Sequence, residues 1–428
     1  MTHIGALCPP SSSHVNTIAA LGRELQRRGH RVTLFGITDI ESKVLVEGLE
    51  FWLIGQSDFP PGSLTEFLTQ IGKLTGLAAT LYWHEKDRRM AATICRDAPG
   101  AMKEAGVEVL LVDQMEPAGG SVAELLGIPF ITVCSALDIN WEPSLPPTYT
   151  PWSYRKAWWA YLRNWMGFYA SKRTVKPIQA VINEYRRQWK LPVQTSPSGL
   201  FASSQFAQIS QQPAAFDFPR TTLPKCFHYT GPFRKSSRQT IPFPYEKLTG
   251  QPLIYASLGT LQNRRQEIFH SIAAACEELD AQLVVSLGGG SSVEEYQGLP
   301  GAPLVVEYAP QLELLTKARL TITHAGLNTV LESLSQAVPM VAIPITHDQP
   351  GVGARLLWTG AGEVVPLNRL SVSRLKAAVQ RVLTEDSYSD RASKLRESIQ
   401  QAGGVVRAAD IVEQAIATGG PVLSSQPV

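Results

Sequence analysis

The chain of 428 residues has few cysteines, no long apolar run and no excess of either charge. Its five cysteines are scattered and form no C-x-x-C pair, which favours free buried thiols over disulfides or metal ligands. No apolar run approaches the roughly 20 residues that a membrane-spanning helix needs, and residues 1–3 lead into a strand-like segment instead of a signal peptide. The net charge of +2 gives no electrostatic reason to expect nucleic acid as a partner. We therefore expect a soluble cytoplasmic protein.

What the chain has instead is an alternation of strand and helix in two series. The first series opens with a strand at Ile4–Cys8, a polar loop, a helix from about Val15 to Arg28 and a strand at Arg31–Phe35. The second series begins at Pro252, after the segment Gly231–Gly250, whose proline, serine and basic residues are typical of a linker. Open α/β sheets of this kind bind ligands at the carboxyl ends of their strands.

The stretch 307–355 carries the clearest chemical pattern. A short run, Leu320–Thr323, ends at His324, and Gly326 allows the chain to turn sharply into a helix. Asn328 and Thr329 stand at the start of that helix, where free N–H groups and the helix dipole favour an anion. Since His324 adds a ring donor, the pattern predicts a phosphate or pyrophosphate site.

Two further pairs of polar residues follow predicted strands. Asp348 and Gln349 come after the buried run Val338–Pro344, and a carboxylate beside an amide suits a ligand with several hydroxyls. His14 lies in the loop after the first strand, and Asp113 follows an apolar run directly. A neutral imidazole can accept a hydroxyl proton near neutral pH. The alternatives are a cap-like polar role for His14 and a helix N-cap role for Asp113.

The stretch 307–355 resembles the nucleotide-sugar signature of the family 1 (UDP-dependent) glycosyltransferases, which runs W-x-P-Q, H-x-G-x-N-S/T-x-x-E, V-P and D-Q. The matching residues are Tyr308, Pro310, Gln311, His324, Gly326, Asn328, Thr329, Glu332, Pro339, Asp348 and Gln349. So many residues in register make the match more specific than a lone glycine motif. Phrases such as H-Y-T-G-P-F and H-D-Q-P-G-V-G-A-R are similar to the bacterial and cyanobacterial zeaxanthin (carotenoid) glucosyltransferase-like group.

The resemblance implies an α/β protein of glycosyltransferase B architecture, with two Rossmann-like domains facing a central cleft. It implies an acceptor-binding domain at 1–231, a linker at 232–250 and a nucleotide-sugar-binding domain at 251–405. A C-terminal helix at 406–420 is expected to pack back on the first domain.

The resemblance also implies roles for single residues. His14 would be the general base and Asp113 its partner, although the family's loop reads G-H-x-x-P and this chain has S-H-V-N. Tyr308 stands where the family usually has a tryptophan stacked on uracil. Asp348 and Gln349 would bind the sugar. UDP binding is implied for Ser257, Gly259, Thr260, Tyr308, Ala309, Gln311, His324, Gly326, Leu327, Asn328, Thr329 and Glu332.

The segment Ser135–Phe168 is dense in tryptophan, tyrosine and proline, with basic residues among them. One interpretation is a loop and helix packed on the domain surface. The other is the lining of a wide apolar acceptor pocket that also touches a membrane. The candidates for that pocket are Trp83, Trp141, Tyr149 and Trp152.

The resemblance therefore implies an enzyme, a hexosyltransferase that moves glucose from UDP-glucose to a hydroxyl of an apolar small molecule. Carotenoids or other terpenoids, flavonoids and phenols are the expected acceptors, and inversion would give a β-O-glucoside. No D-x-D carboxylate cluster accompanies the strands, so we expect no metal and no other cofactor. We also expect a monomer or weak dimer. The alternatives are a UDP-sugar epimerase of the same architecture and a non-catalytic sugar-nucleotide-binding protein.

Overall fold

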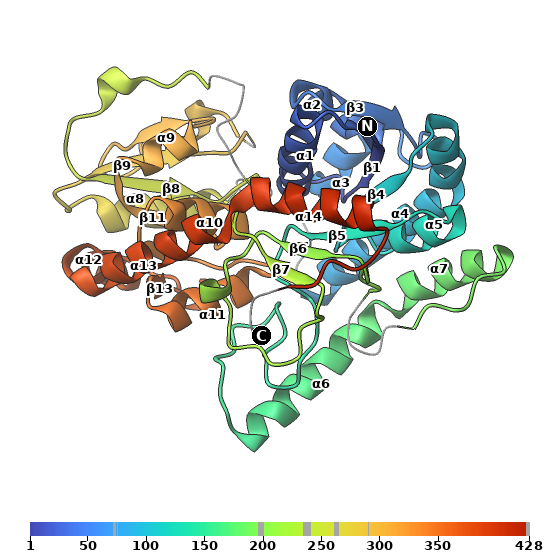
Figure 1. Ribbon diagram of the computed structural model, residues 1–428. Helices are drawn as coiled ribbons and strands as arrows, with labels where there is room; N and C mark the ends of the chain where they lie inside the picture. The colour runs from blue at the N-terminus through green and yellow to red at the C-terminus, as the bar shows by residue number, and fades with distance from the viewer. Residues whose placement is uncertain are drawn as a thin grey trace.

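Two parallel β-sheets, each surrounded by helices, make up the computed structural model (Figure 1). The structure describes residues 1–71, 74, 76–195, 201–233, 241–260, 265–289 and 291–424. The first sheet, within residues 3–229, is the centre of the N-terminal domain, and the second, within residues 253–364, is the centre of the C-terminal domain. Over these described ranges, no helix combines the length and the apolarity needed to cross a membrane.

The sheet of the N-terminal domain has seven parallel strands in the order β3-β2-β1-β4-β5-β6-β7. Its central strands β1 and β4 are buried along their whole length, as their mostly apolar sequences HIGAL and VLLVD require. The strands are β1 (His3–Leu7), β2 (Arg31–Gly36), β3 (Glu50–Leu53), β4 (Val109–Asp113), β5 (Phe130–Cys134), β6 (Gln208–Ser210) and β7 (Phe227–Tyr229).

Helix α1 of the N-terminal domain buries one apolar face. Val15, Ile18, Leu21 and Leu25 of α1 recur at helical spacing and are all buried. The helices are α1 (Ser12–Arg27), α2 (Glu41–Val46), α3 (Ser63–Ile71), α4 (Gly76–Ala105), α5 (Gly119–Leu126), α6 (Trp158–Thr174) and α7 (Lys176–Gln188), with the 3₁₀ helices η1 (Thr38–Ile40) and η2 (Ala214–Phe216).

The sheet of the C-terminal domain has six parallel strands in the order β10-β9-β8-β11-β12-β13. The strands are β8 (Leu253–Ser257), β9 (Gln282–Ser286), β10 (Leu304–Val306), β11 (Ala318–Thr323), β12 (Met340–Ala342) and β13 (Gly362–Val364). The helices are α8 (Gln266–Cys276), α9 (Gln311–Leu315), α10 (Leu327–Ser335), α11 (Gln349–Thr359), α12 (Val372–Thr384) and α13 (Asp386–Ala402), with η3 (Tyr245–Lys247), η4 (Val293–Tyr296) and η5 (Leu367–Arg369).

The last helix, α14 (Gly404–Thr418), returns to the N-terminal domain and lies beside α1 (Figure 1). Val412 is completely buried in the core of that domain, and Arg28 pairs with Asp410 and Glu413 at 2.7 and 2.6 Å. Of the linker predicted at 232–250, residues 234–240 lie outside the described residues, and the domain boundaries stay a prediction.

The domains also share a core at the segment that follows β6. Phe216 in η2 and Leu137 pack against Val330 and Leu356 of the C-terminal domain. The next residue, Asp217, accepts a hydrogen bond from Arg355 of α11 at 2.7 Å, with both side chains 1% exposed. An apolar contact and a buried ion pair therefore join the two domains next to the site.

Candidate active site

Most of the predicted site residues lie where strands of the two sheets end and the domains meet. In the N-terminal domain, His14 is in the first turn of α1, after β1, and Asp113 is the last residue of β4. In the C-terminal domain, His324 follows β11 and Asp348 caps α11. The backbone N–H of Leu137 donates to the Asp348 carboxylate across the interface at 3.2 Å.

His14 and Asp113 form a hydrogen-bonded pair, although they are 99 positions apart. Nδ1 of His14 lies 2.8 Å from Oδ2 of Asp113, which is completely buried, while the histidine side chain is 17% exposed. The hydroxyl of Ser135 donates to the same carboxylate oxygen, and the N–H of Met115 donates to the other at 2.8 Å. Because an ionised carboxylate only accepts, Nδ1 carries the proton and Nε2 keeps its lone pair.

The surroundings of His14 favour its protonated form. Burial lowers the pKa of His14, but the charge of Asp113, its hydrogen bond and the charge of Asp348 outweigh burial and raise the pKa above 6.5. The groups that act on His14 include Lys86 of α4, whose positive charge lowers the pKa. The pair is thus suited to take up a proton and to stabilise the imidazolium that results.

His324 is held in its neutral form between two glycines. Burial lowers the pKa of His324 to about 4, opposed by a hydrogen bond to the main chain of Ser257. A Cβ at Gly259 would lie 2.7 Å from the His324 ring, and one at Gly326 would lie 2.5 Å from it. Both positions therefore require glycine, and Gly259 also has a φ of +73°. The exposed Thr260 follows this turn.

The first turn of α10, predicted to bind the diphosphate, also contacts the N-terminal domain. Leu327 and Thr329 are buried there. The Asn328 side-chain amide donates to the carbonyl of Ser13 at 3.4 Å and accepts from Gln211 at 2.7 Å. The first turn of α10 therefore lies beside Ser13, the residue that precedes His14 in the chain.

The predicted nucleoside residues form a connected group in the C-terminal domain. Gln311 donates to the Glu332 carboxylate and accepts from the hydroxyl of Tyr255 at 3.0 Å. Tyr308 is 52% exposed, and a Cβ at Gly289 would overlap its hydroxyl, so this glycine turn makes room for the ring. Its neighbour Ala309 is buried. An exposed ring above a glycine turn can stack on a flat base.

The two predicted sugar residues begin α11. The side-chain oxygen of Gln349 accepts from the N–H groups of Ile345 and Thr346 at 2.9 and 2.8 Å, which fixes the loop before the helix. His347 has a φ of +55°, and its ring lies 4.4 Å from that of Trp83 on α4. This ring contact is a second link between the domains at the site.

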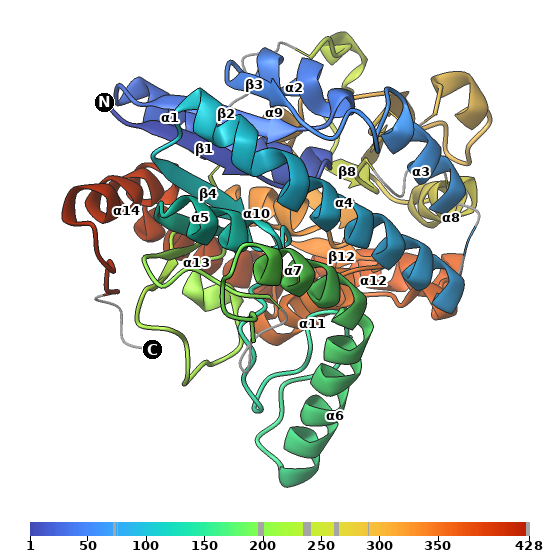
Figure 2. The ribbon, with the colours of Figure 1, turned by 90° about the vertical axis from the view of Figure 1, so that its right-hand side faces the viewer.

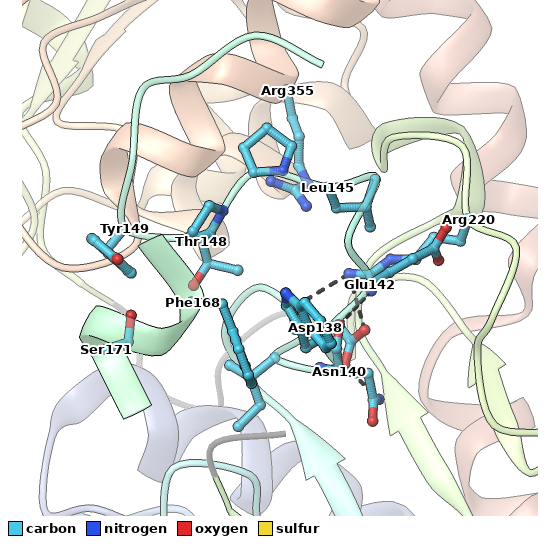
Figure 3. Close-up of a pocket in the computed structure, with 14 residues that line it drawn as sticks. Asp138, Asn140, Glu142, Leu145, Thr148, Tyr149, Phe168, Ser171, Arg220 and Arg355 are labelled. Carbon is cyan, nitrogen blue, oxygen red and sulfur yellow. Dashed lines mark hydrogen bonds and ion pairs between the residues drawn. The ribbon is translucent and has the colours of Figure 1, made fainter. Parts of the chain in front are cut away.

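The structure places the four predicted acceptor residues in different surroundings. Trp83 lies at the domain interface, whereas Trp141 and Tyr149 line a separate cavity of about 40 Å³ (Figure 3). Trp152 packs against Gly167 of α6, outside that cavity's lining. The cavity has room for a few waters but not for a terpenoid ring.

Sequence reasoning missed several residues of the site. Ser135 directly follows β5 and Gln211 directly follows β6. Because ligands bind at the carboxyl ends of parallel strands, both residues could have been predicted. Lys86 and His347 carry no such signal, because they reach the site through packing between α4 and the loop before α11. Among the described residues, no three His, Cys, Asp or Glu side chains are grouped as metal ligands would be. Metal independence stays a prediction.

Solved structures that resemble this one include glycosyltransferases. The calicheamicin glycosyltransferase CalG4 superposes with a TM-score of 0.75, covering 98% of this chain and 100% of its own at 20% identity. Likeness at this identity shows the fold, and the predicted glycosyltransferase B architecture is confirmed.

Sequence comparison narrows this class to a family. The model described as "UDP-glucoronosyl and UDP-glucosyl transferase" matches residues 78–401, and the chain belongs to this family of enzymes. It is 37% identical to the zeaxanthin glucosyltransferase of Pantoea ananas, covering 99% of this chain and 98% of that protein. It is 34% identical to the zeaxanthin glucosyltransferase of Pseudescherichia vulneris, covering 97% and 98%. The predicted family and transferase activity are confirmed.

Proposed function

We propose that this enzyme transfers glucose from UDP-glucose to a hydroxyl of an apolar small molecule, with inversion at the anomeric carbon. The observation that carries the proposal is the His14–Asp113 pair, which lies close enough to Asp348 of the other domain for that charge to act on the histidine. A base and a carboxylate suited to sugar hydroxyls thus share one site. Family membership favours transfer over epimerisation or non-catalytic binding.

In the proposed reaction, Nε2 of neutral His14 takes the proton of the acceptor hydroxyl while the hydroxyl oxygen bonds to the anomeric carbon. The bond between that carbon and the diphosphate oxygen breaks in the same step, and UDP leaves with the electron pair. Such a single displacement inverts the anomeric centre, so an α-linked donor gives a β-glucoside. Asp113 orients the ring and stabilises the imidazolium.

The departing diphosphate needs hydrogen-bond donors where its charge develops. The N–H groups in the first turn of α10 and the neutral ring of His324 are suited to this role, and they are fixed in place before the reaction. Glycine at positions 259 and 326 lets the diphosphate approach this histidine closely.

The rest of the donor would occupy the C-terminal domain. Tyr308 would stack on the base, and Gln311 with Glu332 would bind the ribose or the base edge. Asp348 would accept from sugar hydroxyls. The amide nitrogen of Gln349 would donate to them, because its oxygen is already bound to the main chain.

The acceptor class is proposed from the relatives. Both the Pantoea ananas and the Pseudescherichia vulneris protein are named zeaxanthin glucosyltransferases. A carotenoid or other terpenoid alcohol is therefore our proposed acceptor, with flavonoids and simple phenols as the classes to compare.

The test is release of UDP from UDP-glucose with zeaxanthin in detergent, a triterpenoid alcohol, a flavonol and a simple phenol. We expect acceptor-dependent release that falls by about 10²- to 10⁴-fold in His14→Ala, with UDP affinity unchanged. NMR of the product should show a β-linkage, and a chelator should leave the rate unchanged. UDP binding without turnover on every acceptor, or conversion of UDP-glucose without any acceptor, would contradict the proposal.

A further inference from the structure

The outward face of α6 is apolar, which reverses the usual arrangement of a surface helix. The residues that this helix buries include the small or polar Ala160, Asn164 and Gly167. Apart from the buried Phe168, the large apolar side chains point to solvent, led by Trp158 at 79% exposure. The others are Trp159, Tyr161, Leu162, Trp165, Met166 and Tyr169.

This helix is held firmly on its inner side and extends away from both sheets (Figures 1 and 2). The hydroxyl of Tyr149 donates to the carbonyl of Gly167 at 2.7 Å, and Trp141 stacks on Phe168 with ring centres 4.5 Å apart. The exposed face therefore belongs to an anchored helix at the edge of the molecule.

Basic residues surround the same face. Between Glu142 and Glu184 the sequence contains no acidic residue and six basic ones, although the whole chain is nearly neutral. The Arg163 guanidinium lies over the rings of Trp152 and Trp159, 4.7 and 5.4 Å from their centres. The basic residues are Arg155, Lys156, Arg163, Lys172, Arg173 and Lys176.

We infer that α6 and its flanking basic residues bind the surface of an anionic phospholipid bilayer. Tryptophan and tyrosine are suited to the headgroup region because their rings are apolar and their polar atoms can stay hydrated. Lysine and arginine lay their apolar stems along the rings and place their charges at lipid phosphates. An exposed apolar face alone would suit a protein partner equally well. The local positive charge favours an anionic lipid surface instead.

The test is flotation of the purified protein with vesicles of phosphatidylcholine, alone or mixed with phosphatidylglycerol, without donor or acceptor. The wild type should bind the mixed vesicles, bind the neutral ones far less, and lose binding as salt rises. Replacing Arg173 and Lys176 by Gln should weaken binding about tenfold or more. Replacing Trp158 and Met166 by Ser should weaken it by about the same factor.

Matched controls separate this surface from general effects. Lys317→Gln with Lys394→Gln removes two exposed charges elsewhere, and Leu45→Ser with Val46→Ser removes two exposed apolar side chains of α2. Both control pairs should bind vesicles like the wild type, and every variant should keep its UDP affinity. The inference is overturned if the wild type ignores the mixed vesicles, or if the α6 variants bind as the wild type does. It is equally overturned if the wild type forms dimers that the Trp158 and Met166 replacements dissociate while no vesicle binding occurs.

Discussion

Asp113 and Asp217 are both buried in the N-terminal domain beside the domain interface, and their partners differ. Asp113 accepts from His14 at 2.8 Å and from the hydroxyl of Ser135. Asp217 accepts from Arg355 at 2.7 Å and from the hydroxyl of Tyr229 at 2.8 Å, and it pairs with Arg220 at 2.9 Å. Each carboxylate therefore has one hydroxyl partner, but only Asp113 has a cationic partner that can lose its proton near neutral pH.

The difference in partners gives Asp217 a structural role and Asp113 a role in proton transfer. Burial raises the pKa of Asp217, but Arg220 and Arg355 outweigh it and hold this pKa well below its usual range. Asp217 is therefore a fixed charge that joins α11 to the N-terminal domain. Asp113 instead raises the pKa of a histidine that can gain and lose a proton. A buried carboxylate becomes part of an acid–base device only when its partner titrates.

The largest expected effect is on the rate in His14→Ala. Loss of a general base should lower kcat by up to about 10⁴-fold, while the midpoint of thermal unfolding changes little because Asp113 keeps its other donors. UDP release and a thermal melt measure both. The control is His30→Ala, which removes a histidine paired with Glu413 at 3.1 Å and should leave the rate unchanged. Equal rates in His14→Ala and His30→Ala would contradict the proposed role of the His14–Asp113 pair in the reaction.

The next effect is on stability in Asp217→Asn. This change leaves the buried Arg355 without its counter-ion, whereas Arg220 keeps Asp138 at 3.0 Å, and it should cost about 3–5 kcal/mol of unfolding free energy. Urea unfolding measures the loss, and the folded fraction should keep kcat within a few fold. The double variant Asp217→Asn with Arg355→Met should recover part of the stability, since it removes one uncompensated charge. A stable variant with kcat reduced as in His14→Ala would place Asp217 in the chemistry.

A matched pair of smaller changes removes the hydroxyl from each carboxylate. Ser135→Ala and Tyr229→Phe each delete one hydrogen bond to a buried charge, about 1.5–3 kcal/mol. The Ser135 change should appear in kcat and in its pH profile, because it alters the partner of His14. The Tyr229 change should appear in urea unfolding alone. A kcat effect in Tyr229→Phe with a stability effect alone in Ser135→Ala would contradict the roles assigned to the two aspartates.

The sequence predicted the features that depend on local order. The run Leu320–Thr323 was placed in a strand, and β11 spans Ala318–Thr323. The pairing of His14 with Asp113 was implied by the family resemblance, and the structure explains it, because the adjacent parallel strands β1 and β4 end at the same edge of the sheet. Hydrophobic periodicity and the position of a residue at a strand end depend on neighbours in the sequence, so both can be predicted from it.

Contacts between the domains could not be predicted in this way. Asp217 and Arg355 are 138 positions apart and lie in different domains, so no sequence periodicity relates them. The aromatic residues show the same limit. Trp83 and Trp141 have equal propensities, yet the structure places one at the domain interface and the other beside the cavity under α6. Which surface an aromatic side chain covers is decided by packing between distant segments.

A change of pH should also separate the two aspartates, because they should act in different pH ranges. Because the base must be neutral, kcat/KM should fall as the pH drops through the raised pKa of His14, which lies above 6.5. Asp217 has a lowered pKa, so its contribution to stability is full above the unfolded value of about 3.9 and is lost only as the pH falls further through the folded value.

Between about pH 4 and about pH 6 the protein should therefore stay folded, by circular dichroism, while UDP release declines as His14 becomes protonated. The stability from the charged His14–Asp113 pair has the opposite sign, since it is present below 6.5 and is lost as the pH rises through the histidine's raised pKa. Asp113→Asn removes the charge that raises this pKa, so the acid limb of kcat/KM should move to lower pH. Activity and folding lost at one common pH in the wild type would mean that unfolding, and not protonation of His14, limits the enzyme in acid.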